Sequence, residues 1–354
     1  MRRRFPSRGF NLLELLIALV IGLTLITAFL VVLQRSQRDF TAGESLARLQ
    51  DSARHAMGVL VNDVEHAGFY GLAGAGSVRL VRAGSAPATG DELAQPGEGR
   101  VVPEVGGLPA GAHDCGVNFA VDLRRPVQGS DNHFALGRLA GSPEGREVGS
   151  DARDCAPTGT SGGASDVADT LTLRHASLDI TAPRAGRLQV YSAARSSTAP
   201  LLLFADGQAP GAVDDGEVRD VEIRSYYIAN DSVDRRGWPA LRVKSLTESR
   251  GAAQFRDEEV MPGVEDLQVE FAVVAVEDGQ RVVRYVAADS PRADAESIVA
   301  VRLWLRLRSD VTERGHHDDR VLNYANVTFT PTGEEARHRR LLIERTVAVR
   351  NAIS

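Results

Sequence analysis

The sequence predicts an α+β fold in which one long N-terminal helix packs on antiparallel β-sheet with long loops. Three observations lead to this class. Residues 10–33 are almost wholly apolar, residues 34–66 carry apolar side chains at helical spacing, and short alternating segments follow one another from residue 168 onward. Alternation of apolar and polar residues is typical of strands in sheets with one solvated face. A helix followed by a run of strands indicates α+β architecture.

The apolar run from Phe10 to Leu33 is long enough to cross a membrane. It contains no Lys, Arg, Asp or His, and its single acidic residue is Glu14. As a helix it would be about 36 Å long, against roughly 30 Å for the hydrocarbon core of a bilayer. Four arginines precede it, which predicts a cytoplasmic N-terminus and an exported body. No small-residue cleavage site of a secretory signal peptide closes the run.

Residues 34–66 are predicted to continue this helix as an amphipathic segment. Its apolar residues recur three and four positions apart, and polar residues fill the other positions. The stripe consists of Leu46, Leu49, Ala53, Met57, Leu60, Val61 and Val64. We expect the stripe to pack on a sheet, and we expect the helix to end at Gly68, a residue type common at helix C-caps.

The remainder of the chain is predicted to be β-structure and loops. Residues 83–165 are rich in Gly, Pro, Ala, Ser and Asp and are expected to form long surface loops. The predicted strands are 78–81, 117–123, 171–174, 188–191, 218–228, 241–244, 267–271, 299–307 and 340–349. In 299–307, Val and Leu alternate with Arg302, Trp304 and Arg306, which are expected on the solvated face.

Two cysteines, Cys115 and Cys155, lie in the loop-rich segment. An exported body would meet an oxidising compartment, so we predict a disulfide between them. The bond would close a long loop, where a cross-link restrains the unfolded chain most in the chain-entropy model. The alternative is two unrelated core thiols.

No set of residues converges on a catalytic site, so we predict no enzyme and no cofactor. The glycines of 68–76 lack the strand, Lys and helix of a phosphate loop, and 159–163 (GTSGG) lacks the His and Asp context of a serine protease. The pair of histidines in 316–319 is expected in a solvated turn. The acidic turns 214–217 and 231–234 do not have EF-hand spacing, and calcium there stays an alternative. The net charge of −6 argues against a general nucleic-acid binder.

The segment RGFNLLELLIAL (8–19) resembles the class III signal of type IV pilins and pseudopilins. The resemblance implies that a membrane prepilin peptidase cuts between Gly9 and Phe10 and methylates the amine of Phe10. Glu14 then stands at the fifth mature position, where its implied partner is the N-terminal amine of a neighbouring subunit. Asn11 replaces a more common Thr, and the helix lacks the proline of many major pilins.

Four later segments resemble PilW-type minor pilins: 46–71 (LARLQDSARHAMGVLVNDVEHAGFYG), 261–271 (MPGVEDLQVEF), 298–309 (IVAVRLWLRLRS) and 339–351 (RRLLIERTVAVRN). The resemblance implies a type IV pilin-like fold and a role in initiating pilus assembly, in a priming complex at the filament tip that serves twitching and adhesion. The implied partners are the peptidase, other minor pilins, the major pilin and a tip adhesin. The protein would lie in the inner membrane before it enters the pilus.

The predicted parts of the chain are a cleaved leader (1–9), a membrane and assembly helix (10–33), an amphipathic helix (34–67) and an exported β-rich domain (68–354). Two other functions stay open. A minor pseudopilin of a type II secretion system has the same signal and plan, and twitching would distinguish the two. A signal-anchored periplasmic enzyme or binding protein would show no cut at Gly9.

Overall fold

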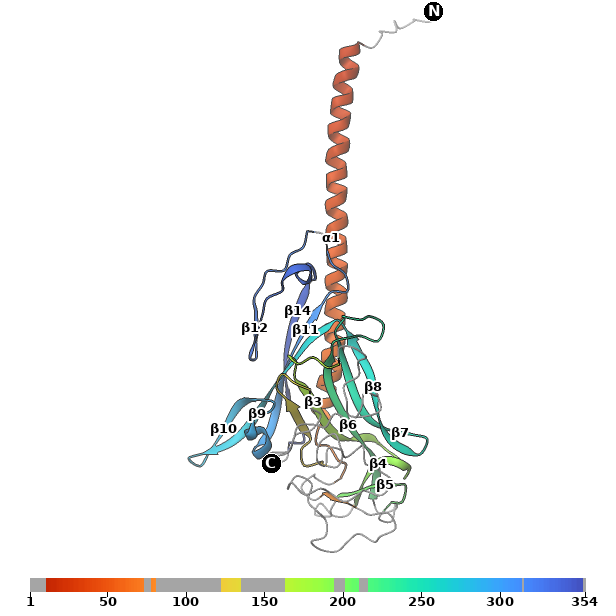
Figure 1. Cartoon of the computed structure of the whole chain (residues 1–354), viewed down its shortest axis with the longest axis vertical. Helices are drawn as coiled ribbons and strands as arrows, with labels where there is room; N and C mark the ends of the chain where they lie inside the picture. Colours follow the sequence, from red (N-terminus) through yellow and green to blue (C-terminus); the bar gives the residue numbers. More distant parts are fainter. Residues whose placement is uncertain are drawn as a thin grey trace, which may run out of the picture. The chain divides into compact units, whose positions relative to one another are not determined.

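The computed structural model describes residues 11–72, 78–80, 122–134, 163–193, 201–209, 216–313 and 315–352. The chain divides into two compact units, residues 1–48 and residues 49–354. The predicted α+β class is confirmed, because one long N-terminal helix is followed by sheets that are almost entirely antiparallel (Figure 1).

Helix α1 (Leu12–His66) runs without a break through both segments that were predicted to be helical. The stripe on its second part is buried from Leu49 onward, where Leu60 and Val64 are fully enclosed. Two members of the predicted stripe differ, since Leu46 is 39% exposed and Val61 is only partly buried. Asp63 is also buried, at 1% exposure, although the stripe contains no polar residue.

The described strands form three sheets. The eight-stranded sheet has the order β1 (Val78–Leu80), β5 (Leu201–Asp206), β4 (Ala185–Ala193), β6 (Gly216–Ala229), β3 (Thr170–Ile180), β2 (Val127–Ser130), and in it β7 (Ala240–Ser249) joins β6 to β8 (Ala252–Pro262). The four-stranded sheet has the order β10 (Gln280–Ala287), β9 (Val264–Glu277), β11 (Ser297–Arg308), β14 (Arg340–Ala348), and β12 (Leu322–Tyr324) pairs with β13 (Val327–Phe329). Only the β1–β5 pair among the described strands is parallel. A short helix, α2 (Pro291–Ala295), and a 3-10 turn, η4 (Gly333–Arg337), complete the described elements.

The hydrophobic core of the second unit lies where α1 meets both large sheets. It includes Leu60 of α1, Tyr226 and Leu241 of the eight-stranded sheet, and Val269 and Leu303 of the four-stranded sheet. Strand β6 is long enough to pair with β4 through its first residues and with β7 through its last. The part of α1 from Leu49 onward therefore holds two sheets in one unit.

Most predicted strands are present, and six of them are longer than predicted. The exception is 117–123: residues 117–121 lie outside the described residues, Asp122 and Leu123 are not in a strand, and β2 starts only at Val127. The sequence missed β5, β8, β10, β12 and β13. In β5 the side chains from Leu201 to Ala205 are buried on both faces, so the strand shows no alternation.

The expectation that Trp304 and Arg306 face solvent is wrong, because the second face of β11 is covered. Both residues are at most 6% exposed, and only Arg302 is partly exposed. The Arg306 guanidinium lies 3.6 Å from the ring centroid of Phe329, and its Nε donates to Glu265 Oε2 at 3.0 Å. The buried cations thus have acidic and aromatic partners, which makes their burial tolerable.

Gly68 terminates α1 as predicted and offers a test of the helix end. Its φ is +80°, and a Cβ added there would lie 2.8 Å from the carbonyl oxygen of Asn351. We expect Gly68→Ala to lower the free energy of unfolding by about 1–3 kcal/mol, since a side chain is unfavourable at positive φ. Urea unfolding of the full chain in detergent, followed by the fluorescence of buried Trp238 and Trp304, would measure this.

Gly58 provides the matched control for this substitution. It lies within α1, and a Cβ there meets nothing within 4 Å. Gly58→Ala should leave the unfolding free energy unchanged or raise it by up to about 1 kcal/mol. If both variants lost the same free energy of unfolding, the positive φ of Gly68 at the helix end would not explain the effect.

Candidate assembly interface

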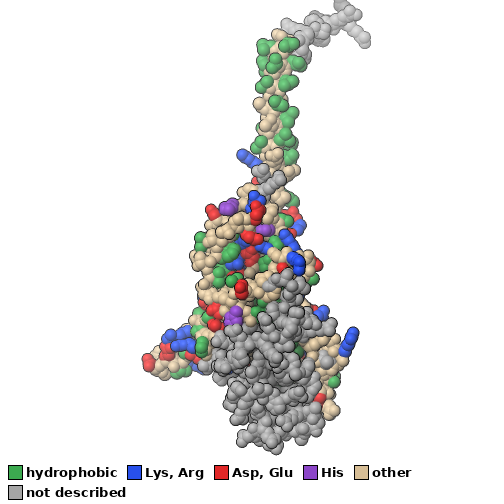
Figure 2. Space-filling model, viewed as in Figure 1, with side chains coloured by type: hydrophobic (Ala, Val, Ile, Leu, Met, Phe, Trp, Pro, Cys, Tyr) green, Lys and Arg blue, Asp and Glu red, His purple; other side chains and the backbone are tan. Residues whose placement is uncertain are grey.

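The N-terminal part of α1 presents an apolar surface. Every large apolar side chain that the structure describes from Leu12 to Leu33 is at least 42% exposed, and Figure 2 shows these side chains covering the N-terminal half of the helix. By length and composition this stretch of α1 can cross a membrane. An exposed apolar surface of this size is typical of a segment that lipid or other protein covers.

The two hydroxyl groups of this stretch bond to carbonyl groups of their own helix. Thr24 Oγ1 donates to the carbonyl oxygen of Ile21 and Thr27 Oγ1 donates to that of Leu23, both at 2.8 Å. A polar group that finds its partner within the helix can be buried in an apolar environment at little cost. The helix is therefore suited to an apolar environment at both threonines.

Glu14 is the exception on this surface. It lies in the first turn of α1, where its backbone N–H donates to the carbonyl oxygen of Asn11 at 3.0 Å, and its side chain is exposed. The positive end of the helix dipole favours a carboxylate there. None of the described residues forms an ion pair with Glu14. In an apolar environment a carboxylate is costly without a cation, and the described residues supply none to Glu14.

The other predicted site residues cannot be placed. Gly9 and Phe10, the predicted cleavage and methylation positions, lie outside the described residues. Cys115 and Cys155 do so too. The cut, the methylation and the disulfide therefore stay predictions.

A buried ion pair fixes α1 to the eight-stranded sheet, and the sequence analysis missed it. Asp63 of α1 accepts two hydrogen bonds from Arg224 Nη1 of β6, at 2.8 and 3.1 Å. The hydroxyl of Tyr226 donates to the same carboxylate. The Asp63 side chain is 1% exposed and that of Arg224 is 34% exposed. The only sequence signal is an acidic residue between Leu60 and Val64 of the apolar stripe.

Charge and burial act in opposite directions at this contact. Burial works to lower the pKa of Arg224, and the carboxylates of Asp63 and Glu222 outweigh it and raise that pKa. Burial and the neighbouring Asp63 raise the pKa of Tyr226 well above its usual value. Arg224 thus stays charged and Tyr226 stays a hydrogen-bond donor across the physiological pH range.

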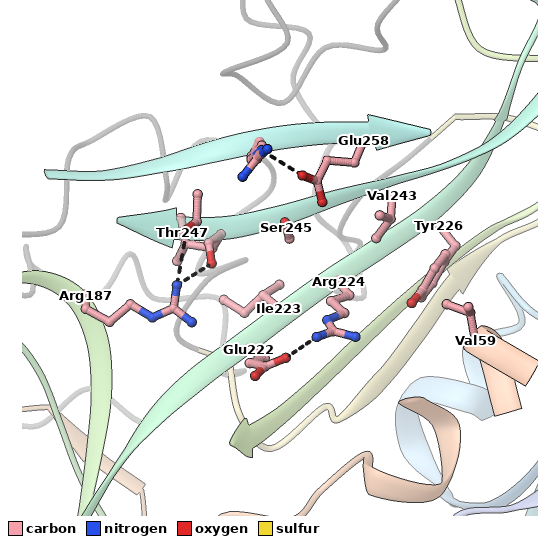
Figure 3. Close-up of a pocket in the computed structure, with 12 residues that line it drawn as sticks. Val59, Arg187, Glu222, Ile223, Arg224, Tyr226, Val243, Ser245, Thr247 and Glu258 are labelled. Atoms are coloured by element: carbon pink, nitrogen blue, oxygen red, sulfur yellow. Dashed lines mark hydrogen bonds and ion pairs between the residues drawn. The ribbon is translucent and has the colours of Figure 1, made fainter. Parts of the chain in front are cut away.

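A pocket of about 350 Å³ opens beside this ion pair, between Val59 of α1 and strands β6, β7 and β8 (Figure 3). Its charged lining residues have partners within the chain: Arg224 pairs with Glu222, and Arg256 Nε lies 2.8 Å from Glu258 Oε1. Arg187 Nε lies 3.2 Å from Asp220 Oδ2. Each of these three arginines thus has a carboxylate partner within the chain.

Carboxylates of the turns 316–319 and 231–234 also have partners within the chain. Asp318, from the turn with the two histidines, is buried beside Arg320, whose hydrogen bonds hold the pKa of Asp318 below its usual value. Asp231 Oδ1 accepts from the backbone N–H of Gly237 at 2.6 Å and so closes its own turn. Within the part of the chain that the structure describes, no three His, Cys, Asp or Glu residues are placed to hold a metal. Calcium in the acidic turns stays an alternative.

Asp169 joins the two large sheets and predicts a dependence of stability on pH. Its carboxylate accepts from the backbone N–H groups of Asn132, after β2, and Val269, in β9, at 2.8 and 2.7 Å. Burial raises its pKa to about 8, and these two hydrogen bonds oppose the rise without cancelling it. The folded state therefore binds a proton on the Asp169 carboxylate more tightly than the unfolded state does, since the pKa of this group in the unfolded chain is about 4.

The contribution of Asp169 to the free energy of unfolding should be fully present below about pH 4. It should be lost as the pH rises through about 8. We expect Asp169→Asn to remove this loss, because an amide carries no charge to be buried. Unfolding free energies of both proteins, measured from pH 4 to pH 9, would test this. Parallel curves for the two proteins would contradict the assignment.

The described chain is thus a long N-terminal helix with an apolar first part, followed by largely antiparallel sheet. Residues 225–351 match the model of the family described as type IV pilus-assembly protein W. This confirms the predicted resemblance, since 261–271, 298–309 and 339–351 lie in the matched segment; the fourth segment of that prediction, 46–71, lies outside it. The C-terminal part of the chain is thus similar to a family of pilus-assembly proteins.

Among solved structures, a type IV-like pilin from Thermus thermophilus is similar to this chain. The identity is 14% and the TM-score is 0.26, over 52% of this chain and 78% of the Thermus chain. No curated protein matches the chain in sequence.

Proposed function

We propose that this protein is a minor pilin that takes part in initiating type IV pilus assembly. The observation that carries the proposal is the combination of two features in one chain. Residues 8–19 have the pattern of a prepilin signal, and residues 225–351 match a pilus-assembly family. Helix α1 begins within the signal and exposes an apolar surface there, and its residues from Leu49 onward pack in one core with strands of the matched segment.

The proposed mechanism is assembly without catalysis. The peptidase removes 1–9 and methylates Phe10, and residues 10–33 hold the protein in the inner membrane with its body in the periplasm. The exposed apolar side chains then pass from lipid to contacts with other pilin helices. Glu14 pairs with the N-terminal amine of a neighbouring subunit, so that a charge that is costly in the apolar environment gains its counter-ion on assembly.

The proposed partners are other minor pilins and the major pilin, in a priming complex at the pilus tip. The second unit supports contacts of this kind, because β10 at the edge of the four-stranded sheet exposes Val283 and Tyr285. Large exposed apolar residues beside a sheet edge are common in protein interfaces. Direct binding to a tip adhesin is part of the same proposal.

The intact mass of the membrane-extracted protein tests the proposal. Made with an active prepilin peptidase, the chain should begin at methylated Phe10; made without the peptidase, it should keep residues 1–9. A chain that keeps its leader in the presence of active peptidase would overturn the assignment and favour a signal-anchored periplasmic protein. Spectra before and after reduction would also show whether Cys115 and Cys155 form a disulfide.

A further inference from the structure

Lys244 is the only lysine among the 41 basic residues of this chain, and all others are arginine. It lies in β7, and its side chain is fully buried. A buried ammonium group is costly, and arginine is the usual choice for a buried ion pair. A chain that uses arginine everywhere else therefore has its one side-chain primary amine in the interior.

Among the described residues, the buried amine faces the carboxylate of Asp257. Asp257 of β8 stands directly opposite Lys244 in the antiparallel pair, and its side chain is also fully buried. Lys244 Nζ lies 3.3 Å from Asp257 Oδ2. Residues that stand opposite each other in an antiparallel pair hold their side chains on the same face, so the sheet itself keeps the amine and the carboxylate together.

Two further groups hold the carboxylate in place. Arg242 Nε donates to Asp257 Oδ1 at 2.6 Å, and the hydroxyl of Tyr227 donates to Oδ2 at 2.6 Å. The ring of Phe134 packs edge-on against Tyr227, with centroids 5.2 Å apart. Hydrogen-bond donors on both oxygens draw electrons from Cγ and stabilise the negative charge that develops there when a nucleophile adds.

We propose that Lys244 and Asp257 condense to an isopeptide bond that ties β7 to β8. Lys244 Nζ transfers one proton to Oδ2, which produces a free amine and a carboxylic acid. Nζ then bonds to Cγ, the bond from Cγ to Oδ2 breaks, and Oδ2 leaves as water with this proton and a second proton from Nζ. Oδ1, held by Arg242, becomes the amide oxygen. Nothing is oxidised or reduced, and no other reactant is needed.

The charges of the surroundings favour the product. Before condensation the site buries the cations of Arg242 and Lys244 beside Asp257, with Glu259 Oε2 3.6 Å from Arg242 Nη1. The amide removes one positive and one negative charge, and Arg242 keeps Glu259 as its counter-ion. Fewer buried charges mean a smaller desolvation penalty, and a site closed to water slows the reverse hydrolysis. The inference does not depend on the proposed function.

The mass of the purified full-length protein, reduced and denatured, tests the proposal. We expect it to be lighter by one water than its sequence from the observed N-terminus, once any methyl group on the N-terminal amine has been added to the calculated mass. Cleavage after arginine should yield residues 243–250 joined to residues 257–281 as one branched peptide. An amine-reactive label applied to the denatured chain should leave Lys244 unmodified. A protein of full mass, with a linear, labelled 243–250 peptide, would overturn the proposal and leave an ordinary buried ion pair.

Two variants sharpen the result. Lys244→Arg keeps the positive charge but offers no primary amine, so it should show the full mass and no branched peptide. Glu258→Gln changes an exposed neighbour of Asp257, with a side chain that is 47% exposed, and should retain the loss of one water. A branched peptide in Lys244→Arg, or its absence in Glu258→Gln, would contradict the assignment. If Lys244→Arg does not fold, the peptide map of the natural chain decides by itself.

Discussion

Replacing Arg224 by methionine should lower the free energy of unfolding of the second unit by about 3–5 kcal/mol. The change leaves Asp63 buried, at 1% exposure, with the hydroxyl of Tyr226 as its remaining hydrogen-bond donor. A buried carboxylate that has lost its cation keeps its whole desolvation penalty. Urea unfolding in detergent, followed by the fluorescence of Trp238 and Trp304, would report on this unit alone, since both tryptophans lie within it.

A second variant separates the ion pair from the packing of α1. Asp63→Asn combined with Arg224→Met removes both charges and keeps an acceptor for Tyr226, so most of the loss should be recovered. The matched control is Arg256→Met, in the same pocket, whose exposed ion pair with Glu258 should contribute less than about 1 kcal/mol. If Arg256→Met and Arg224→Met cost the same, the buried pair does not hold α1 to the sheet.

If the proposed function holds, Glu14→Gln should reduce incorporation of the protein into pili by about tenfold or more, while leaving the proposed cut after Gly9 unchanged. The amide keeps the size of the side chain and removes the charge that would bind a neighbouring amine. One lost charge pair in an apolar environment is worth at least about 1.4 kcal/mol, which is tenfold in an equilibrium constant. The amount of protein in sheared pili, relative to the amount in the membrane, would measure the effect.

Glu44→Gln is the control for this prediction. Glu44 lies on the same helix, and its exposed ion pair with Arg48, at 2.6 Å, contributes little to stability. Its loss should leave incorporation at the natural level. Natural incorporation of Glu14→Gln, with normal processing, would contradict the pairing of Glu14 with a neighbouring amine and leave apolar packing as the sole basis of assembly.

Local patterns in the sequence determined the helix and most of the strands. Residues 10–33 and the stripe from Leu46 to Val64 predicted α1 because helical periodicity depends only on the spacing of apolar residues. The glycine at position 68 predicted the helix end for an equally local reason, since its φ is positive. The motif around Gly9, Phe10 and Glu14 is likewise contained in a few neighbouring residues.

Only the tertiary structure decided which polar residues are buried and what they contact. Asp63 meets Arg224 across 161 positions of sequence, and no local pattern encodes such a pairing. Arg306 looked solvated because strand alternation shows two faces but not what covers each of them. Lys244 read as an ordinary strand residue, and only the register of β7 against β8 places its amine opposite Asp257. Periodicity follows from neighbouring residues, whereas contacts between distant segments follow from how the elements pack.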